Sequence, residues 1–250
     1  MGTMSAMPDI DHEQASSFGQ AAQAYERGRP GYPEAALDWL LPAGAVDVVD
    51  LGAGTGKLTR QLVGRGLQVV AVEPSAGMRD ELTTALPGVT ALPGAAENIP
   101  LPDSSADAVL VAQAWHWVDP AAGVPEVARV LRPGGRLGLI WNFRDDTVDW
   151  VAALGRSMRS LADDPTVMEV ELDPPFGPVE RHAVPWRHRS TPDGLRDLVA
   201  SRSYVITAPP AERRRVLREV DELLAGHPDL AGRDAFDLPY LSVCFRASTQ

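Results

Sequence analysis

The segment Val48-Val49-Asp50-Leu51-Gly52-Ala53-Gly54-Thr55-Gly56-Lys57 decides the fold of this 250-residue chain. It is typical of a buried strand, followed by a glycine-rich turn and the first residues of a helix. Three glycines at alternate positions leave almost no side chain over the turn, so a ligand can approach the backbone closely. The free N–H groups at the start of the helix would face that ligand. The segment therefore predicts a binding site for a nucleotide-like molecule.

Strands and helices alternate around this segment. We predict helices over residues 34–41, 57–64, 76–85 and 124–131, and strands over residues 46–50, 68–72, 89–92, 107–112 and 136–141. The central strands are nearly continuous apolar runs, which is typical of parallel strands buried on both faces. The pattern predicts an α/β, doubly wound, Rossmann-like fold with helices on both faces of the sheet.

The second half of the chain loses this regular alternation. It contains predicted helices over residues 149–162, 191–200 and 211–225, and predicted strands over residues 179–186 and 238–247. We expect these strands to complete a mostly parallel sheet of seven strands.

Residues 15–250 would then form a single domain behind a flexible tail of residues 1–14. Within that domain we assign residues 15–42 to an N-terminal helical lid and residues 43–145 to the cofactor-binding core. Residues 146–250 would complete the sheet and form the substrate side.

Composition argues against several classes of protein. Lys and Arg number 23 against 34 Asp and Glu, a formal net charge of −11. Such a chain is a poor binder of duplex nucleic acid, whose affinity comes largely from phosphate neutralisation. The single cysteine, Cys244, cannot form an internal disulfide. No apolar run approaches the roughly 18 residues of a membrane span, and the N-terminus lacks a basic start and an apolar core. We therefore expect a cytoplasmic protein with no membrane partner.

Two common nucleotide-binding motifs do not fit the glycine turn. A phosphate-binding P-loop needs Ser or Thr after Gly56-Lys57 and a glycine at position 51, but Leu58 and Leu51 stand there. The dinucleotide fingerprint needs its third glycine at position 57 or 59, which are Lys57 and Thr59. The spacing disfavours an NAD(P)-dependent Rossmann oxidoreductase and leaves it as an alternative.

The remaining motif, Asp-x-Gly-x-Gly-x-Gly, is followed by further landmarks. These are Glu73 after the second strand, residues 94–100 with Asp107, the segment Gln113-Ala114-Trp115-His116-Trp117, and Leu131-Arg132-Pro133-Gly134-Gly135. In this order they resemble the class I S-adenosylmethionine-dependent methyltransferases (type 11-like), over residues 16–145 and more loosely beyond. The chain is most similar to the small-molecule branch that includes trans-aconitate methyltransferase-like proteins. That likeness rests on Phe18, the run from Tyr25 through Arg29-Pro30 to Tyr32-Pro33, Trp115-His116-Trp117 and Ser203-Tyr204.

The resemblance implies S-adenosyl-L-methionine as the methyl donor, with S-adenosyl-L-homocysteine as its product. A carboxylate at Glu73 can accept both ribose hydroxyls, and Asp50 suits the cationic methionyl end. Glu97 reads the adenine edge or is a solvated loop acid, and Met78 packs on the adenine or ribose or belongs to the helix core. The full set of expected cofactor-binding residues is Tyr25, Arg29, Asp50, Gly52, Ala53, Gly54, Gly56, Glu73, Pro74, Met78, Ala96, Glu97, Gln113, Ala114 and Trp115.

The chemistry of methyl transfer needs few catalytic groups, because the donor carries its own leaving group. A carboxylate acceptor needs no general base. A hydroxyl or amine acceptor needs one, and His116 is the candidate, with a packing role between its two tryptophans as the alternative. Tyr25 is the second candidate, because an aromatic ring near the sulfonium gains from cation–π attraction. A surface turn is the alternative for its segment.

No metal is expected, because no carboxylate directly follows the fourth strand to complete a hard-oxygen site. Four arginines form either a positive patch that selects a carboxylated substrate or a solvated face: Arg144, Arg187, Arg189 and Arg202. The acceptor is expected to be a small molecule, with a carboxylate as one candidate. A non-catalytic sensor or partner protein that binds S-adenosylmethionine stays open as a further alternative.

Overall fold

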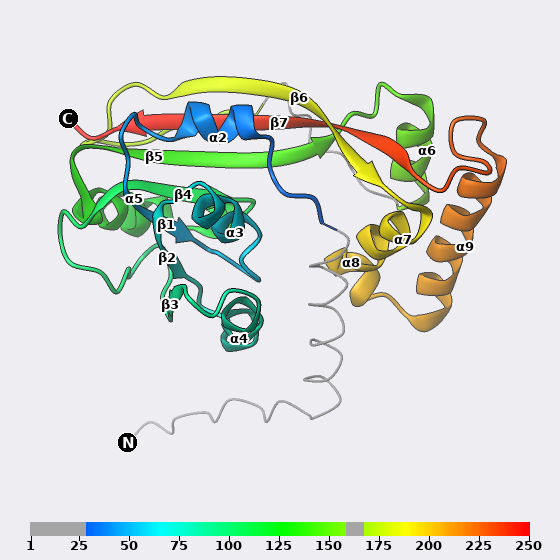
Figure 1. The fold of residues 1–250 in the computed structure, drawn as a ribbon, viewed down its shortest axis with the longest axis horizontal. Helices are drawn as coiled ribbons and strands as arrows, with labels where there is room; N and C mark the ends of the chain where they lie inside the picture. The colour runs from blue at the N-terminus through cyan, green and yellow to red at the C-terminus, as the bar shows by residue number, and fades with distance from the viewer. Residues whose placement is uncertain (1–28, 159–167) are drawn as a thin grey trace, which may run out of the picture.

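The computed structural model describes residues 29–158 and 168–250 and has the predicted α/β architecture (Figure 1). The strands are β1 (Asp47–Leu51), β2 (Gln68–Val72), β3 (Thr90–Leu92), β4 (Ala106–Ala112), β5 (Leu131–Arg144), β6 (Glu180–Ser190) and β7 (Phe236–Ser248). The helices are α2 (Glu34–Leu40), α3 (Lys57–Gly64), α4 (Ala76–Ala85), α5 (Pro120–Val130), α6 (Asp149–Ser157), α7 (Pro192–Ala200), α8 (Ser203–Ile206) and α9 (Pro210–Gly226). A short 3-10 helix, η1, spans Trp115–Trp117.

The seven strands of the described chain form one sheet in the order β3-β2-β1-β4-β5-β7-β6. The pairs β1–β2, β2–β3, β1–β4 and β4–β5 are parallel, whereas β7 runs antiparallel to both β5 and β6. The expected mostly parallel sheet is confirmed. The chain winds outward from β1 in one direction and returns to β4 on its other side, so the carboxyl ends of β1 and β4 form the switch point where such folds bind ligands.

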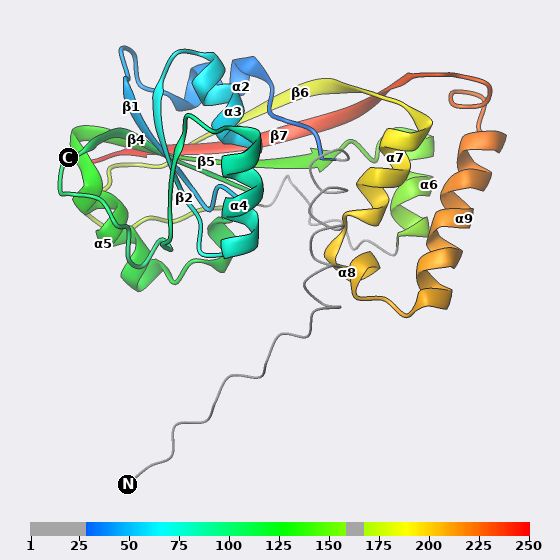
Figure 2. The same cartoon turned by 60° about the horizontal axis from the view of Figure 1, so that its bottom comes forward.

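Helices lie against the sheet (Figure 2), and their apolar side chains form two layers with those of the strands. On one face, α2 and α3 pack against alternate strand residues such as Ile140 and Cys244. On the other face, α5 packs against residues of opposite parity such as Val109 and Leu139. Because neighbouring residues of a strand point to opposite faces, both layers explain why the strands are apolar throughout.

Helix α2 belongs to this core. Ala36, Leu37 and Leu40 are fully buried, and α2 contacts β5, β6 and β7. Within the segment expected to form the lid, α2 is therefore part of the layer that covers the sheet. Residues 15–28 of that lid, and the tail before it, lie outside the described residues.

The strands β5, β7 and β6 extend beyond the others, and α6, α7, α8 and α9 gather at their far end (Figures 1 and 2). We call these four helices the C-terminal helical cluster. Leu154, Leu198 and Val220 of the cluster pack with Leu238 and Tyr240 of β7 in a second hydrophobic core. Residues 146–250 contribute β6 and β7 to the sheet, and they also form a helical part that we did not separate from sequence.

Some element boundaries differ from the prediction. Helix α5 begins at Pro120 and not at residue 124, because the Asp119 carboxylate accepts a hydrogen bond from the Ala121 N–H (3.1 Å) and proline fits the first helical turn. Strand β5 begins at Leu131, which pairs with Ala106 ahead of a register shift. Strand β6 continues to Ser190 because β7 pairs with it along that length. No helix among the described residues is long and apolar enough to cross a membrane.

The close approach of α2 to β5 can be tested at Gly138. In Gly138→Ala the new Cβ would lie 2.5 Å from Leu110 Cδ2 and 3.1 Å from Leu40 Cδ2. We expect the free energy of unfolding to fall by about 1–3 kcal/mol through overpacking. In the control Gly155→Ala, a Cβ within α6 meets nothing within 4 Å, so stability should stay constant or rise by about 0.5–1 kcal/mol. Urea denaturation measures both, and equal effects would contradict the packing.

Candidate functional site

The glycine turn after β1 has the conformation that only glycine adopts readily. Gly52, Gly54 and Gly56 have φ values of 72°, 57° and 87°. A Cβ placed at Gly52 would lie 2.8 Å from Cβ of Ala114, which follows β4. One at Gly56 would lie 2.9 Å from Leu82 Cγ of α4. The turn therefore lies between the end of β4 and α4, with no room for side chains at Gly52 and Gly56. We call this turn the glycine cradle.

Glu73 follows β2 beside this turn. Its carboxylate is 6% exposed, and it accepts hydrogen bonds from the Gly54 N–H (3.0 Å) and the Ser75 N–H (2.9 Å). An ionised carboxylate offers about four lone-pair positions. Two are used in the protein, so two remain for hydroxyl groups of a ligand, as a ribose would require. Pro74 next to it is exposed.

Asp50, at the end of β1, is completely buried under the turn. Its Oδ2 accepts a hydrogen bond from the Thr59 hydroxyl (2.5 Å), whereas its Oδ1 has no partner among the described residues. Burial raises the pKa of this carboxyl to about 7, and the charge of Glu73 adds to the rise while Thr59 opposes it. A buried acceptor without a donor suits a ligand that brings a positively charged donor.

The adenine-side residues lie around the same turn. Met78 of α4 is 38% exposed, with Sδ 4.0 Å from the position of a Cβ at Gly54, so it lies over the turn and not in the helix core. Ala96 is buried, and the exposed Glu97 accepts a hydrogen bond from the Asp119 N–H (2.8 Å). That bond ties the loop to the start of α5, and part of the Glu97 carboxylate is used for it.

The segment directly after β4 contains four of the predicted site residues: Gln113, Ala114, Trp115 and His116. Gln113 has a φ of 60°, a conformation that is strained for a residue other than glycine, and its N–H donates to the Ile140 carbonyl (2.9 Å). Ala114 contacts the turn as described, and Trp115 is buried in the core under the sheet. His116 is exposed on η1, with its ring 4.8 Å from that of Trp117, which is 82% exposed.

A small cavity continues from the turn toward the C-terminal helical cluster. It is lined by Arg29, Pro30, Tyr32, Lys57, Gln113, Asn142, Arg202 and Tyr240. Its wall is held by Asn142 of β5, whose Nδ2 donates to the Gly31 carbonyl (2.9 Å) and whose Oδ1 accepts from the Ser242 hydroxyl (2.6 Å). Arg29 lines this cavity together with Lys57, the residue that follows Gly56. Tyr25 lies outside the described residues.

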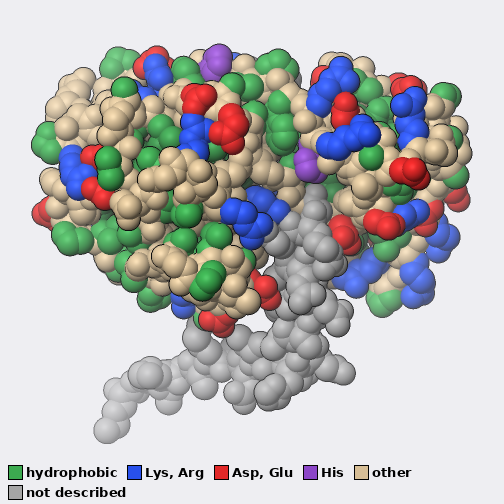
Figure 3. Space-filling view, in the orientation of Figure 1, with side chains coloured by type: hydrophobic (Ala, Val, Ile, Leu, Met, Phe, Trp, Pro, Cys, Tyr) green, Lys and Arg blue, Asp and Glu red, His purple; other side chains and the backbone are tan. Residues whose placement is uncertain are grey.

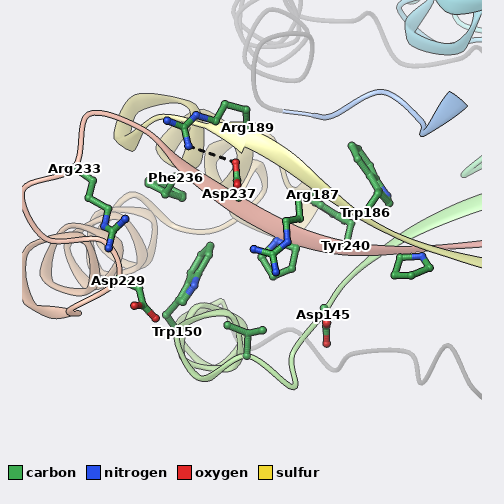
Figure 4. A pocket seen from close by; sticks show the side chains of 13 residues that line it. Asp145, Trp150, Trp186, Arg187, Arg189, Asp229, Arg233, Phe236, Asp237 and Tyr240 are labelled. Carbon is green, nitrogen blue, oxygen red and sulfur yellow. Dashed lines mark hydrogen bonds and ion pairs between the residues drawn. The ribbon is translucent and has the colours of Figure 1, made fainter.

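The four arginines of the predicted patch do not form one group. Arg144 lies directly opposite Tyr240 in the β5–β7 pair, and Arg202 lines the small cavity with Tyr240. Arg187 and Arg189 line a larger cavity of about 620 Å³ at the end of β6 and the start of β7. Figure 4 shows Arg187 pointing away from the side taken by Trp186, as alternation along a strand requires. Figure 3 shows Lys and Arg side chains on both sides of the boundary between the sheet and the helical cluster.

Two residues of this region were not singled out from sequence. Tyr240 lines both cavities. His188 is half-buried two residues beyond Trp186, and burial together with the positive charge of Lys57 lowers its pKa. It is therefore neutral at pH 7 and able to accept a proton. Only the pairing of β6 with β7 places these residues near the turn, and no local motif signals it.

Comparisons with known proteins agree with this geometry. A family model described as a methyltransferase domain matches residues 49–139. An uncharacterized methyltransferase of Mycobacterium tuberculosis is 60% identical over 232 residues, covering 93% of this chain and 95% of the relative. An uncharacterized methyltransferase-like protein of Schizosaccharomyces pombe is 34% identical over 237 residues, covering 90% and 93%. A solved structure, proposed to be a type II methyltransferase of Anaeromyxobacter dehalogenans, has a TM-score of 0.66 at 24% identity, covering 88% of this chain and 97% of its own.

The fold and the glycine cradle define an α/β protein built around a nucleotide-type cofactor. With its relatives, the chain belongs to the class I S-adenosylmethionine-dependent methyltransferases and is an enzyme of that class. This sets aside the alternative of a nicotinamide-dependent oxidoreductase.

The buried carboxyl of Asp50 predicts a specific pH dependence of stability. Its pKa is raised from 3.8 to about 7 in the folded protein, so between these values the folded state binds more protons than the unfolded state. The free energy of unfolding should therefore fall as pH rises from about 4 to about 7, by up to about 4 kcal/mol relative to Asp50→Asn. Denaturation of both proteins without cofactor at several pH values measures this difference. Parallel pH profiles would contradict it.

Proposed function

We propose that this protein transfers the methyl group of S-adenosyl-L-methionine to a small-molecule acceptor by in-line displacement. The observation that carries the proposal is the Glu73 carboxylate, which is fixed by the Gly54 and Ser75 N–H groups with acceptor capacity to spare. When bound, S-adenosylmethionine supplies an electrophilic methyl group on a sulfonium, and the bond electrons stay on sulfur as the thioether leaves.

The protein's contribution is to bind S-adenosylmethionine and to orient it for the transfer. In the proposal, Glu73 accepts the ribose hydroxyls, and Asp50 Oδ1 accepts from the ammonium of the methionyl end. Arg29 binds the methionyl carboxylate. The fit is supported by the orphaned Asp50 oxygen and by a turn in which a Cβ at Gly52 would meet Ala114. A rigid cradle of this kind lowers the entropic cost of alignment.

The adenine and the methyl end are assigned to the two flanks of the turn. Met78, Pro74, Ala96 and Glu97 surround the adenine side, and Ala53, Gln113, Ala114 and Trp115 flank the methyl end. The strained backbone of Gln113 supports the second assignment, because such strain persists where the surrounding structure fixes a functional segment.

A general base is needed only for a hydroxyl or amine acceptor. His116 and Tyr25 stay the predicted catalytic residues, and His188 is a second candidate base because it is neutral at pH 7. A carboxylate acceptor would require none of them as a base, since it is already ionised.

We also propose a cytoplasmic location and no duplex nucleic acid as partner. Support comes from the buried thiol of Cys244, the single cysteine, which suits a reducing compartment, and from the net charge of −11.

Removal of the Glu73 carboxylate tests the ribose assignment. Glu73→Ala should weaken binding of S-adenosylmethionine and S-adenosylhomocysteine by about 1.5–3 kcal/mol, the cost of a lost charged hydrogen bond. The control Asp80→Asn removes an exposed carboxylate from α4 and should leave affinity unchanged. Calorimetry or tryptophan fluorescence measures both. Unchanged affinity in Glu73→Ala would mean that Glu73 is not the ribose ligand, and tight NADH binding without any response to S-adenosylmethionine would overturn the proposed function.

A further inference from the structure

Side-chain amides hold the segment of residues 29–33, which leads into α2 and belongs to no helix or strand (Figures 1 and 2). The Tyr32 N–H donates to Gln61 Oε1 of α3 (2.8 Å), and Gln61 Nε2 donates to the Tyr32 carbonyl (2.7 Å). Nδ2 of Asn142 in β5 donates to the Gly31 carbonyl (2.9 Å). Two amide side chains from separate elements thus satisfy backbone groups that strand pairing would otherwise bind.

Both amides are fixed by their own surroundings. Asn142 Oδ1 accepts from the hydroxyl of Ser242 (2.6 Å), which is completely buried in β7. Gln61 lies on α3, the helix that begins directly after the glycine cradle. A Cβ at Gly31 would lie 2.6 Å from Gln61 Oε1, so any larger residue there would displace this amide. The segment is therefore attached both to the helix of the cradle and to the sheet.

The segment held in this way supplies part of the wall of the small cavity. Arg29, Pro30 and Tyr32 line it together with Lys57 and Gln113. Both amides bind the backbone of the segment and leave its side chains to line the cavity. Because proline fixes its own φ and restricts the residue before it, Pro30 transmits the position of this backbone to Arg29. The two amides thus determine from which point the Arg29 side chain extends.

We propose that Asn142 and Gln61 are positioning residues for methyl transfer, which hold Arg29 in place for the methionyl carboxylate of the donor. This rests on the proposed function, which assigns that carboxylate to Arg29. Neither amide contacts the donor in the proposal, and each acts through the backbone of the segment. Holding this backbone before the donor arrives lowers the entropic cost of binding and of alignment.

The test is calorimetric binding of two probes to the full chain. S-adenosylhomocysteine contains the methionyl carboxylate, whereas adenosine has the adenine and the ribose without it. The variants are Asn142→Ala, Gln61→Ala, Arg29→Gln and the double variant that combines Asn142→Ala with Arg29→Gln. The matched control is Gln68→Ala, which removes an exposed amide at the start of β2, at the opposite edge of the sheet.

We expect Asn142→Ala and Gln61→Ala each to weaken S-adenosylhomocysteine binding about five- to tenfold, since each removes hydrogen bonds to the segment. Adenosine binding should stay unchanged, because a shifted Arg29 affects only the methionyl end. Arg29→Gln should weaken S-adenosylhomocysteine binding at least as much. Adding Asn142→Ala to it should cause no further loss, as expected when one residue acts through the other. Gln68→Ala should leave the binding of both probes unchanged.

Asn142→Asp tests the donor of the hydrogen bond with little change of shape. Its carboxylate still accepts from the Ser242 hydroxyl but has no N–H for the Gly31 carbonyl. It should therefore weaken S-adenosylhomocysteine binding at least as much as Asn142→Ala does, with adenosine binding again unchanged.

Three results would overturn the proposal. They are wild-type affinity for S-adenosylhomocysteine in any of the single variants at Asn142, Gln61 or Arg29, equal weakening of both probes, and a further loss of affinity in the double variant. In each case binding of S-adenosylhomocysteine by the wild type leaves the proposed function intact. Failure of the wild type to bind S-adenosylhomocysteine would instead refute the proposed function itself.

Discussion

The contact between the glycine turn and the end of β4 is the constraint on which the rest of the site depends. Gly52 has no room for a side chain because Ala114 lies against it, and the N–H groups of Gly52 and Ala53 both donate to the Val72 carbonyl at the end of β2. The turn therefore joins three parallel strands at their carboxyl ends, through backbone hydrogen bonds to β2 and the contact with Ala114 after β4. It is fixed to the sheet, and the hydrogen bond from the Gly54 N–H to Glu73 is fixed with it. Substrate alignment of this kind needs no closing loop to form the cradle.

The region beyond the switch point depends on a different feature, the antiparallel extension of the sheet. Strands β5, β7 and β6 continue past the switch point and carry two hydrophobic cores. Tyr240 is anchored by the second core and by Trp186, while Asn142 and Ser242 connect the strands to Gly31 just ahead of α2. Apolar packing thus fixes the ring of Tyr240 and leaves its hydroxyl among arginines. The same strands that extend the sheet therefore also hold Tyr240 in place.

Local signals in the sequence predicted the elements around the glycine turn well. The bounds of α3, β2 and α4 are the predicted ones, because each has an apolar period of its own and clear glycine or proline limits. The contacts of the antiparallel extension could not be predicted in the same way. Arg144 and Tyr240 meet only through strand register. Arg144 is separated from Arg187 and Arg189 because these two residues of β6 point to the face opposite that of Trp186, and Arg202 lies between α7 and α8. Helix α5 began early because Asp119 acts as its N-cap, and the second core depended on how four short helices pack together.

Ion pairs connect the structural elements of this acidic chain, whose net charge is −11. Arg129 lies between Glu126 and Asp103, and Arg132 between Asp47 and Asp107. Asp107 lies near the amino end of β4, and its carboxylate also accepts hydrogen bonds from the N–H groups of Val46 and Asp47 at the start of β1. The two ends of these parallel strands are therefore held by different interactions. Charged groups join the amino ends, whereas at the carboxyl ends the glycine turn lies against Ala114. Because the charge pairs lie at the opposite edge of the sheet, the turn keeps the close backbone approach that a side chain at Gly52 would prevent.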